Sequence, residues 1–251
     1  GTEPTTRQQH DATRMTGIAD HVVADSTFLE QRIRPINPNV TWIPDNVNGR
    51  VYRGTREHRG SRLRLVWSGI GKKAAHLLAI VDVLATLPDA ELVLVTDEPP
   101  TFLADLERAI PCRVVSFSDR RYARTLLECD VIISPKRLVN AYEMAHTEYK
   151  ITLGMAVGLP AVASPQQSYR EAIGLRGGGV IADSNDEWRA AFERLRDPAG
   201  RTALGQRAKQ TVLERYETAV VARQYGTLLG TLVAPAVHST APSDRRTVKT
   251  S

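Results

Sequence analysis

The sequence has few cysteines and no long apolar run, and these absences exclude several classes of protein. Among its 251 residues only Cys112 and Cys129 are cysteines, and they show neither C-x-x-C spacing nor a nearby His pair. This pattern excludes a disulfide framework and favours two reduced core thiols in a cytoplasmic protein over a disulfide. No run of about 18 apolar residues occurs, so no membrane-spanning helix is predicted.

The start of the chain also lacks an export signal. The first twenty residues contain no apolar h-region, so no signal peptide is expected. The chain opens on Gly1 rather than Met, which favours processing, a tag remnant or a piece of a longer protein.

What is present is an alternation of strand and helix patterns. With 42% hydrophobic residues the chain can bury a core, as one large domain or two small ones. Apolar runs recur between helix-period segments, and most are continuous Val/Ile/Leu runs, as in strands buried on both faces. The sequence therefore predicts an α/β fold with a doubly wound parallel sheet. The predicted strands are 21–24, 40–43, 63–67, 91–96, 113–117, 130–134, 160–164 and 179–182.

Helix signals fill the intervals between these strands. Ser184 and Glu187 form a capping-box pattern that opens a helix through Leu195. Other helices are predicted at 74–87, 101–110, 148–157, 201–215 and 218–232. Residues 235–251 show no periodicity and are expected to be disordered.

Positive charge gathers in one segment, 49–64, which holds six arginines against the single acid Glu57, in a chain of net charge +5. One interpretation is a solvated linker. A second is contact with anionic lipid headgroups or ligand phosphates. Nucleic acid is a third and is disfavoured, since only Tyr52 could stack on bases.

The chain divides at this arginine-rich segment. Residues before Pro44 carry two predicted strands, too few for an independent parallel sheet, whereas six follow from Leu63 onward. The first part should lean on the second or belong to a domain whose beginning is missing. The predicted divisions are 1–48, a linker at 49–62, a sheet domain at 63–216, a terminal helix at 217–234 and a tail at 235–251.

Two loops after predicted strands could carry chemistry, because ligands of open parallel sheets bind beyond the carboxyl ends of the strands. The first loop, SGIGKKAAH, offers Gly69 and Gly71 for a tight turn and Lys72 or Lys73 for an anion. Phosphate contact and a plain glycine turn are both open for it, since it matches no complete phosphate-binding motif.

The second loop, PKRLVNAYEMAHTEYK, is long and polar. It places Lys136, Arg137, His146, Glu148 and Lys150 just before a predicted helix, which makes it the best-equipped anion site in the chain. An ordinary surface lysine is the alternative for Lys150, and a solvated side chain is the usual state of an isolated loop histidine such as His146.

The segment after this loop runs through a helix, a strand and a turn in quick succession. The helix 148–157 should end at Gly158, Pro160 prevents its continuation, and 161–163 forms the next strand. Ser168 and Tyr169 then lie beyond the carboxyl end of that strand, so one pocket should gather a helix N-terminus and a loop that follows a strand.

These stretches resemble a known family. KITLGMAVGLPAVAS is similar to the K-x-x-E-A-M-A-x-G-x-P-V-V-A-S segment of the retaining GT-B glycosyltransferases, often called glycosyltransferase family 4 (group 1). Three further segments, IPDNVN, LRLVWSGIGKK and ECDVIISP, resemble the end of the family's N-terminal domain and two strands of its donor domain, in the same order. The resemblance covers residues 15–230, and its motifs are individually loose.

The resemblance implies a function and a set of site residues. It implies a transferase of hexosyl type, acting with retention in bacterial-type glycan biosynthesis, that binds a nucleotide-diphospho-sugar as donor substrate with no separate cofactor and no metal. Residues 1–48 would end the acceptor domain and 63–216 would bind the donor. The implied binding residues are Gly69, Gly71, Lys72 or Lys73, His146, Glu148 and Lys150 around the diphosphate, Ser118 and Asp119 near the base, and Ser168 and Tyr169 near the sugar.

The sequence departs from the family at two carboxylates. The family has two glutamates separated by seven residues, the second of which holds the donor ribose, and the matching positions here are Ala145 and Leu153. A divergent branch in which Lys150 supplies the charge fits better. Two other functions stay open: a non-catalytic GT-B-like partner or scaffold, and a sugar-nucleotide epimerase. The acceptor is unidentified, no nucleic-acid partner is expected, and the expected location is the cytoplasm, with peripheral contact at the inner face of a membrane as an extension.

Overall fold

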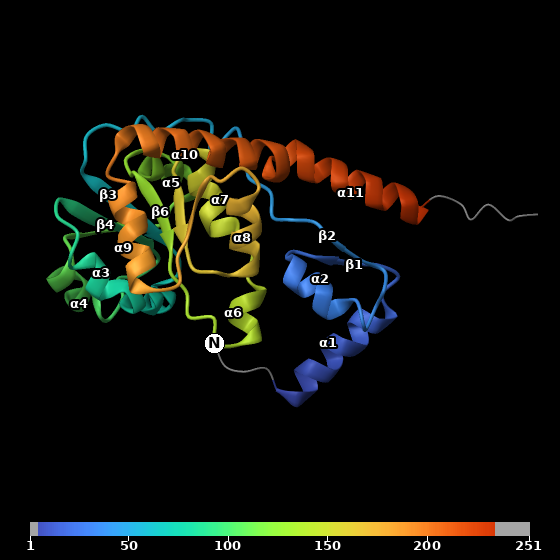
Figure 1. Ribbon diagram of the computed structural model, residues 1–251. Helices are drawn as coiled ribbons and strands as arrows, with labels where there is room; N and C mark the ends of the chain where they lie inside the picture. The colour runs from blue at the N-terminus through green and yellow to red at the C-terminus, as the bar shows by residue number, and fades with distance from the viewer. Residues whose placement is uncertain (1–4, 234–251) are drawn as a thin grey trace, which may run out of the picture.

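A computed structural model describes residues 5–233, and two parallel sheets lie within this range. The larger sheet has six strands in the order β5-β4-β3-β6-β7-β8 (Figure 1). Every pairing in it is parallel, as the continuous apolar runs predict. Its strands are β3 Leu63–Ser68, β4 Ala90–Thr96, β5 Cys112–Ser116, β6 Val131–Ser134, β7 Ala161–Ala163 and β8 Gly179–Ile181.

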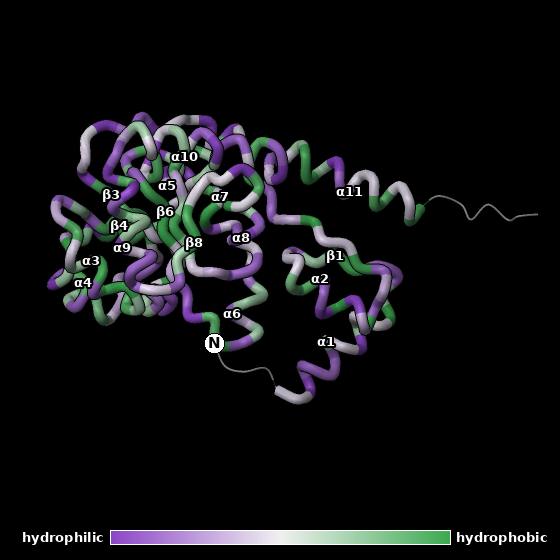
Figure 2. The backbone as a smooth tube through the Cα atoms, viewed as in Figure 1, coloured by the Kyte–Doolittle hydropathy of each residue, from purple (hydrophilic) through white to green (hydrophobic). Residues whose placement is uncertain are grey.

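Helices cover both faces of this sheet and bury a core on each. Side chains alternate along β3, so that Val66 joins the core on one face while Leu65 and Trp67 join the other. Figure 2 shows green, hydrophobic stretches in the strands around β6, with more purple in the surrounding helices and loops. The first core lies under α5 Asp119–Leu127, α7 Tyr149–Ala156, α8 Gln167–Gly174 and α10 Pro198–Thr211. The second lies under the 3-10 helix η1 Gly71–Ile80, α3 Val81–Leu84, α4 Leu103–Ala109 and α9 Asn185–Arg194.

A second, two-stranded sheet lies beside the large one. β1 Val22–Ala24 pairs with β2 Val40–Trp42, and α2 Thr27–Ile33 packs against both strands, with α1 Thr6–Ile18 farther from the larger unit's strands (Figure 1). Hydrogen bonds tie α2 to the larger unit, where Ser26 Oγ donates to the carbonyl of Ala145 at 2.9 Å. The small unit that holds the two-stranded sheet therefore contacts the larger unit through α2.

The chain returns to this second unit at its other end. After α10 the π-helix η2 Val212–Tyr216 leads into α11 Thr218–Val233, which extends over the two-stranded sheet (Figure 1). At the crossing, the N–H of Val47 donates to the carbonyl of Tyr216 at 2.6 Å. Among the described residues no helix combines the length and the apolar character needed to cross a membrane.

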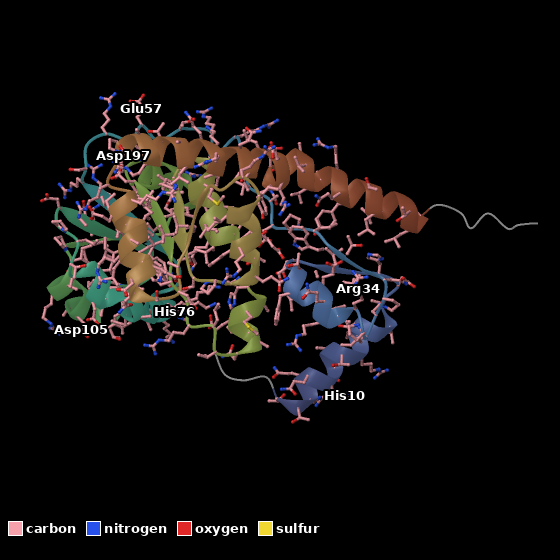
Figure 3. The ribbon with its side chains drawn as sticks, viewed as in Figure 1. His10, Arg34, Glu57, His76, Asp105 and Asp197 are labelled. Atoms are coloured by element: carbon pink, nitrogen blue, oxygen red, sulfur yellow. The ribbon has the colours of Figure 1, made fainter. Side chains whose placement is uncertain are left out.

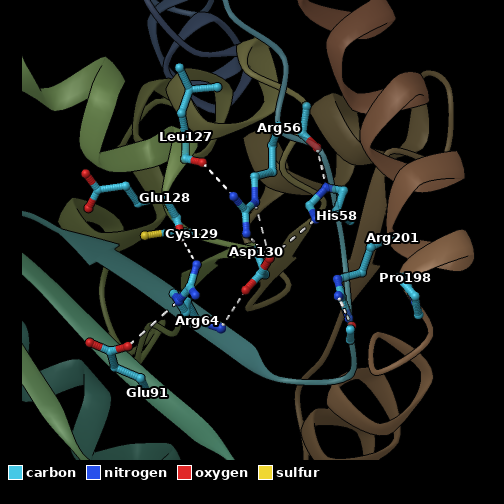
Figure 4. A network of polar contacts seen from close by, with 12 residues as sticks. Arg56, His58, Arg64, Glu91, Leu127, Glu128, Cys129, Asp130, Pro198 and Arg201 are labelled. Atoms are coloured by element: carbon cyan, nitrogen blue, oxygen red, sulfur yellow. Dashed lines mark hydrogen bonds and ion pairs between the residues drawn. The ribbon is translucent and has the colours of Figure 1, made fainter.

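The arginine-rich segment packs against the larger unit instead of lying free in solvent. Arg56 Nη2 lies 2.9 Å from Asp130 Oδ1, and the backbone N–H of Arg64 donates to the same carboxylate at 3.0 Å (Figure 4). Arg59 pairs with Glu57, while Arg62 and Arg64 lie near Glu91. Burial alone would raise the pKa of Asp130, but bonds from His58, Arg64 and Arg56 hold it below its usual value. Most of the arginines in this segment thus pair with carboxylates of the same molecule.

The predicted strands agree with the structure, whereas the helices α1, α5 and α8 were not predicted. All eight predicted strands are present, the Ser184 capping box is formed, and Gly158 ends α7 with a φ of 82°. The predicted helix 74–87 is instead mostly the 3-10 helix η1, which has no side-chain cap at Ile70. The predicted loop at 135–150 contains a short helix, α6 Ala141–Ala145, and the predicted turn SPQQSYRE begins α8. The tail expected to be disordered lies outside the described residues.

Candidate functional site

A groove lies at the carboxyl ends of the strands, and the glycine loop after β3 forms its floor. A side chain at Gly69 would place its Cβ 2.9 Å from Lys150 Nζ and from Trp67, so only glycine allows this close approach. The N–H of Gly71 donates to Asp97 Oδ1 at 2.8 Å, which lowers the pKa of that carboxyl. The loop is thus fastened to the end of β4 and packed directly over Lys150.

One half of the groove is a cationic pocket of about 310 Å³. It lies between the loops that follow β3 and β6 and the first turn of α7. Three lysines reach it from three different elements, together with two histidines and one glutamate. Among the residues described, no carboxylate lies within ion-pair distance of any of these lysines. The lining residues are Gly69, Ile70, Lys73, His76, Pro135, Lys136, Glu143, His146, Thr147, Tyr149, Lys150 and Tyr169.

Lys150 stands in the first turn of α7 and lies under the glycine loop. Its Nζ is 4.8 Å from the centroid of the Trp67 ring, a cation–π contact that replaces part of its hydration. Burial, together with the charge of Lys73, lowers the pKa of Lys150 to about 8. Lys150 is half-buried and lines both halves of the groove, so an anion bound there could contact it.

Lys136 lies two residues after the end of β6 and lines the same pocket. Its Nζ donates to Gln166 Oε1 at 2.5 Å and lies 5.1 Å from the centroid of the Tyr169 ring. Burial, together with Lys150, lowers the pKa of Lys136 to about 7. An anionic ligand would favour the protonated form of both lysines.

Lys73 completes the set through His146. His146 Nδ1 lies 2.7 Å from the carbonyl of Tyr142 and must donate to it, so Nε2 is free to accept from Lys73 Nζ at 2.9 Å. Burial and the neighbouring lysines lower the pKa of His146, which keeps this tautomer neutral. His146 therefore holds Lys73 in place without adding charge.

A second polar pair, His76 and Glu143, lines the same pocket. His76 is labelled in Figure 3, and its Nε2 lies 3.4 Å from Glu143 Oε2. The other ring nitrogen, Nδ1, accepts from the backbone N–H of Arg137 at 3.2 Å. Glu143 is the carboxylate among the lining residues, so the pocket carries one acceptor-only group opposite three cations.

The other half of the groove is an aromatic pocket of about 320 Å³. Phe117 packs on Tyr122 at 5.5 Å between ring centroids, and Tyr52 meets Tyr122 edge-on at 6.4 Å. The two halves share Gly69, Ile70, Tyr149 and Lys150, so they adjoin along one groove. The remaining lining residues are Ser68, Val95, Asp97, Asp119 and Leu153.

The structure brings some of the predicted site residues together and leaves others apart. Gly69, Lys73, His146, Lys150 and Tyr169 line the cationic pocket, and Asp119 lines the aromatic one. The predicted residues that line neither pocket are Gly71, Lys72, Ser118, Glu148 and Ser168. Lys72 is exposed on the outer side of η1, and Ser168 is buried, where it donates to the carbonyl of His146.

Glu148 lies at the N-terminal end of α7 and outside both halves of the groove. It is 2% exposed, and neither of its carboxylate oxygens has a hydrogen-bond partner among the described residues. Burial raises the pKa of Glu148 to about 7. The expectation that Glu148 contacts a diphosphate is therefore not supported by its position.

Several groove residues were not among the predicted site residues. Lys136 belongs to the loop predicted to be the best-equipped anion site, although it is not among the residues that the resemblance implies, and Phe117 follows β5. Tyr52 comes from the linker, whereas His76 and Glu143 come from helices, and no local pattern marks these three.

No family model matches the sequence, and no curated protein matches it. Solved structures do resemble the fold. Sucrose-phosphate synthase from Thermosynechococcus elongatus matches with a TM-score of 0.73 at 18% identity, over 92% of this chain and 62% of that one. Anabaena Alr3699/HepE in complex with UDP-glucose matches with a TM-score of 0.73 at 13% identity, over 91% and 68%. WaaG, a glycosyltransferase involved in lipopolysaccharide biosynthesis, matches with a TM-score of 0.67 at 15% identity, over 90% and 68%.

These structures are GT-B glycosyltransferases, so the chain has a divergent GT-B fold, and the predicted fold class and resemblance are confirmed. At such identities the likeness establishes the fold alone, since one fold hosts many functions. The chain spans 62% of the length of the sucrose-phosphate synthase chain.

Proposed function

We propose that the groove binds a nucleotide-diphospho-sugar and that the chain acts in a glycosyltransferase. The observation that carries the proposal is the meeting of Lys73, Lys136 and Lys150 at the carboxyl edge of the sheet without carboxylate partners among the described residues. Three cations in a partly buried pocket are costly unless an anion joins them. The HepE structures, which hold UDP or UDP-glucose, support a ligand of this class.

The two halves of the groove suit the two ends of such a ligand. The diphosphate would lie on the three lysines, and the base would lie against Phe117 and Tyr52 in the aromatic half. In transfer, the anomeric carbon forms a bond to the acceptor while its bond to the diphosphate oxygen breaks, and negative charge grows on that oxygen. Lys150 and its neighbours would stabilise this charge. A hexosyl donor, retention of configuration and a role in bacterial glycan synthesis are part of the proposal, supported by the sequence resemblance.

Calorimetric titration of nucleoside diphosphates and their sugar conjugates into the chain tests this function. Lys150→Ala should weaken binding of the preferred nucleotide by about tenfold or more, because a charge-assisted contact to phosphate is lost. Lys72→Ala is the matched control, since Lys72 is an exposed lysine next to Lys73 but outside the groove. The Lys72→Ala variant should bind the nucleotide with wild-type affinity. If no nucleotide binds, or if both variants behave alike, the proposal is wrong.

A non-catalytic GT-B-like partner is the second candidate, and Leu153 favours it. Leu153 lines the aromatic pocket at the position where the resembled family carries a carboxylate, and Ala145 fills the other such position. A protein of this kind would bind a sugar nucleotide without consuming it. Release of nucleoside diphosphate from a bound conjugate, abolished in Lys150→Ala, would exclude this candidate.

We propose a cytoplasmic location. Any peripheral contact with a membrane would depend on the linker arginines that have no partner within the described residues. Arg50 and Arg53 have no ion-pair partner among the described residues, whereas the other four arginines of segment 49–64 have partners within the molecule. An Arg50→Gln/Arg53→Gln variant should therefore lose sedimentation with vesicles of anionic phospholipid at low salt. An Arg59→Gln variant should sediment like the wild type, and absence of wild-type sedimentation would contradict membrane contact.

A further inference from the structure

We propose that Glu143, positioned by His76, binds the hydroxyl groups of the donor sugar and makes the groove prefer a sugar conjugate over the free nucleoside diphosphate. This inference rests on the proposed function and names the residue that reads the sugar. It starts from a mismatch in the cationic pocket, which contains one carboxylate among groups that attract anions.

Glu143 is not explained by pairing with the lysines. Its side chain is 16% exposed, and among the described residues it lies within ion-pair distance of His76 alone. The negative charge of Glu143 raises the pKa values of Lys136, Lys150 and His146, so it acts on the groups that line the pocket. The carboxylate thus faces the same space as the cations while remaining free to bind something else.

His76 fixes the direction of this carboxylate. The N–H of Arg137 donates to His76 Nδ1 at 3.2 Å, so a neutral ring carries its proton on Nε2, the atom 3.4 Å from Glu143 Oε2. Burial and the nearby lysines Lys136, Lys150 and Lys73 lower the pKa of His76, although Glu143 acts in the opposite direction. The lowered pKa favours the neutral ring. One carboxylate oxygen is held in this way, and the other is available to a ligand.

The backbone under Glu143 is also fixed. Asn140 caps α6, and its Oδ1 accepts from the N–H of Glu143 at 2.9 Å. The side chain therefore projects from an ordered first turn, next to Tyr142 and Lys73, which lie 3.4 Å apart between phenol oxygen and Nζ.

The chemistry of a carboxylate decides what it can bind here. Carboxylates and phosphates both only accept hydrogen bonds, so Glu143 repels a phosphate and accepts from hydroxyl groups. A ligand that satisfies the whole pocket must carry phosphate oxygens for the lysines and hydroxyl donors for Glu143. A sugar joined to a diphosphate has both, whereas a nucleoside diphosphate alone leaves Glu143 facing its terminal phosphate.

The test compares UDP with UDP-glucose by calorimetry, with the GDP and ADP pairs as replacements if the base differs. Glu143→Ala should weaken UDP-glucose by about tenfold or more, because charge-assisted hydroxyl bonds are lost. UDP should be weakened far less, because the lost support for lysine protonation is offset by the removal of a repulsion. Glu143→Gln should lie between, since it keeps one acceptor oxygen. Glu107→Ala removes a negative charge from the exposed side of α4, outside both pockets, and should change neither affinity.

His76 is a positioning residue, so His76→Ala should lower the preference for the conjugate without weakening UDP. Equal loss of UDP and UDP-glucose in Glu143→Ala, or no loss of either, would overturn the role of Glu143 while leaving donor binding intact. A wild-type chain that binds none of the nucleotides would overturn the proposed function itself, and this inference with it. Circular dichroism and thermal unfolding of each variant separate these outcomes from misfolding.

Discussion

At the scale of single residues, the groove holds lysines whose charge depends on what is bound. Burial and neighbouring lysines lower the pKa of Lys136 to about 7 and that of Lys150 to about 8. Both side chains are therefore partly neutral in the empty groove near neutral pH. A bound diphosphate would raise both pKa values, so binding should take up protons.

This linkage predicts a pH dependence with a definite sign. Affinity for the nucleotide sugar should be highest below about pH 7 and fall by about tenfold or more between pH 7 and pH 9, because neutral lysines must be protonated before they hold phosphate. The sugar conjugate is the better probe, since it lacks the terminal phosphate that titrates near about pH 6. Calorimetry in two buffers of different ionisation enthalpy would measure the proton uptake at about pH 8.

The Lys136→Met variant is the control for this dependence. It should bind more weakly at about pH 7 and lose part of the pH effect, because the side chain with the lower pKa is absent. An affinity that stays constant over the whole range would show that the lysines are charged before binding, contrary to the expected shift.

At the scale of elements, the packing of α10 against the end of α7 depends on a glycine. A Cβ at Gly205 would lie 2.1 Å from the carbonyl oxygen of Gly158, whose φ of 82° ends α7. Gly205→Ala should therefore lower the free energy of unfolding by roughly 2 to 4 kcal/mol, because two backbones must move apart. Gly226, in α11, has no atom within 4 Å of its Cβ position. Gly226→Ala should raise stability by about 0.5–1 kcal/mol through helix propensity alone.

Urea unfolding of both glycine variants checks this contrast. The two midpoints should move in opposite directions from the wild-type midpoint. A shift of Gly205→Ala toward higher stability would mean that α10 does not pack closely on Gly158.

The elements also show what the sequence could and could not predict. The strands were predictable because each is a short run of apolar residues buried on both faces, as in Leu92–Val95 of β4. α6 and α8 were missed because polar stretches such as SPQQSYRE carry no helical period before tertiary contacts form. The rule that ligands bind after strands found Gly69 and Lys150, but Tyr52, His76 and Glu143 reach the groove only through the packing of linker and helices.

At the scale of the whole molecule, few contacts join the two sheets. The chain crosses between them at Val47, which pairs with Glu217, and Arg215 lies over the ring of Trp42 at 5.5 Å. Hydrogen bonds from Thr27 to Glu171 and from Thr147 to Asp45 add to the junction. The larger unit, by contrast, is closed at its amino edge by the Asp130 network, in which Arg56 and Arg64 converge on one carboxylate (Figure 4).

This difference predicts two levels of stability within one chain. The β1–β2 sheet has three paired positions, and a two-stranded sheet is marginal alone, so it should open more easily than β3 and β4. Native-state hydrogen exchange should give lower opening free energies for residues 22–24 and 40–42 than for 63–68 and 90–96. Ser26→Ala removes the bond to Ala145 and should widen this gap without changing exchange in β3. Equal protection of both sheets would instead show that they unfold as one cooperative unit.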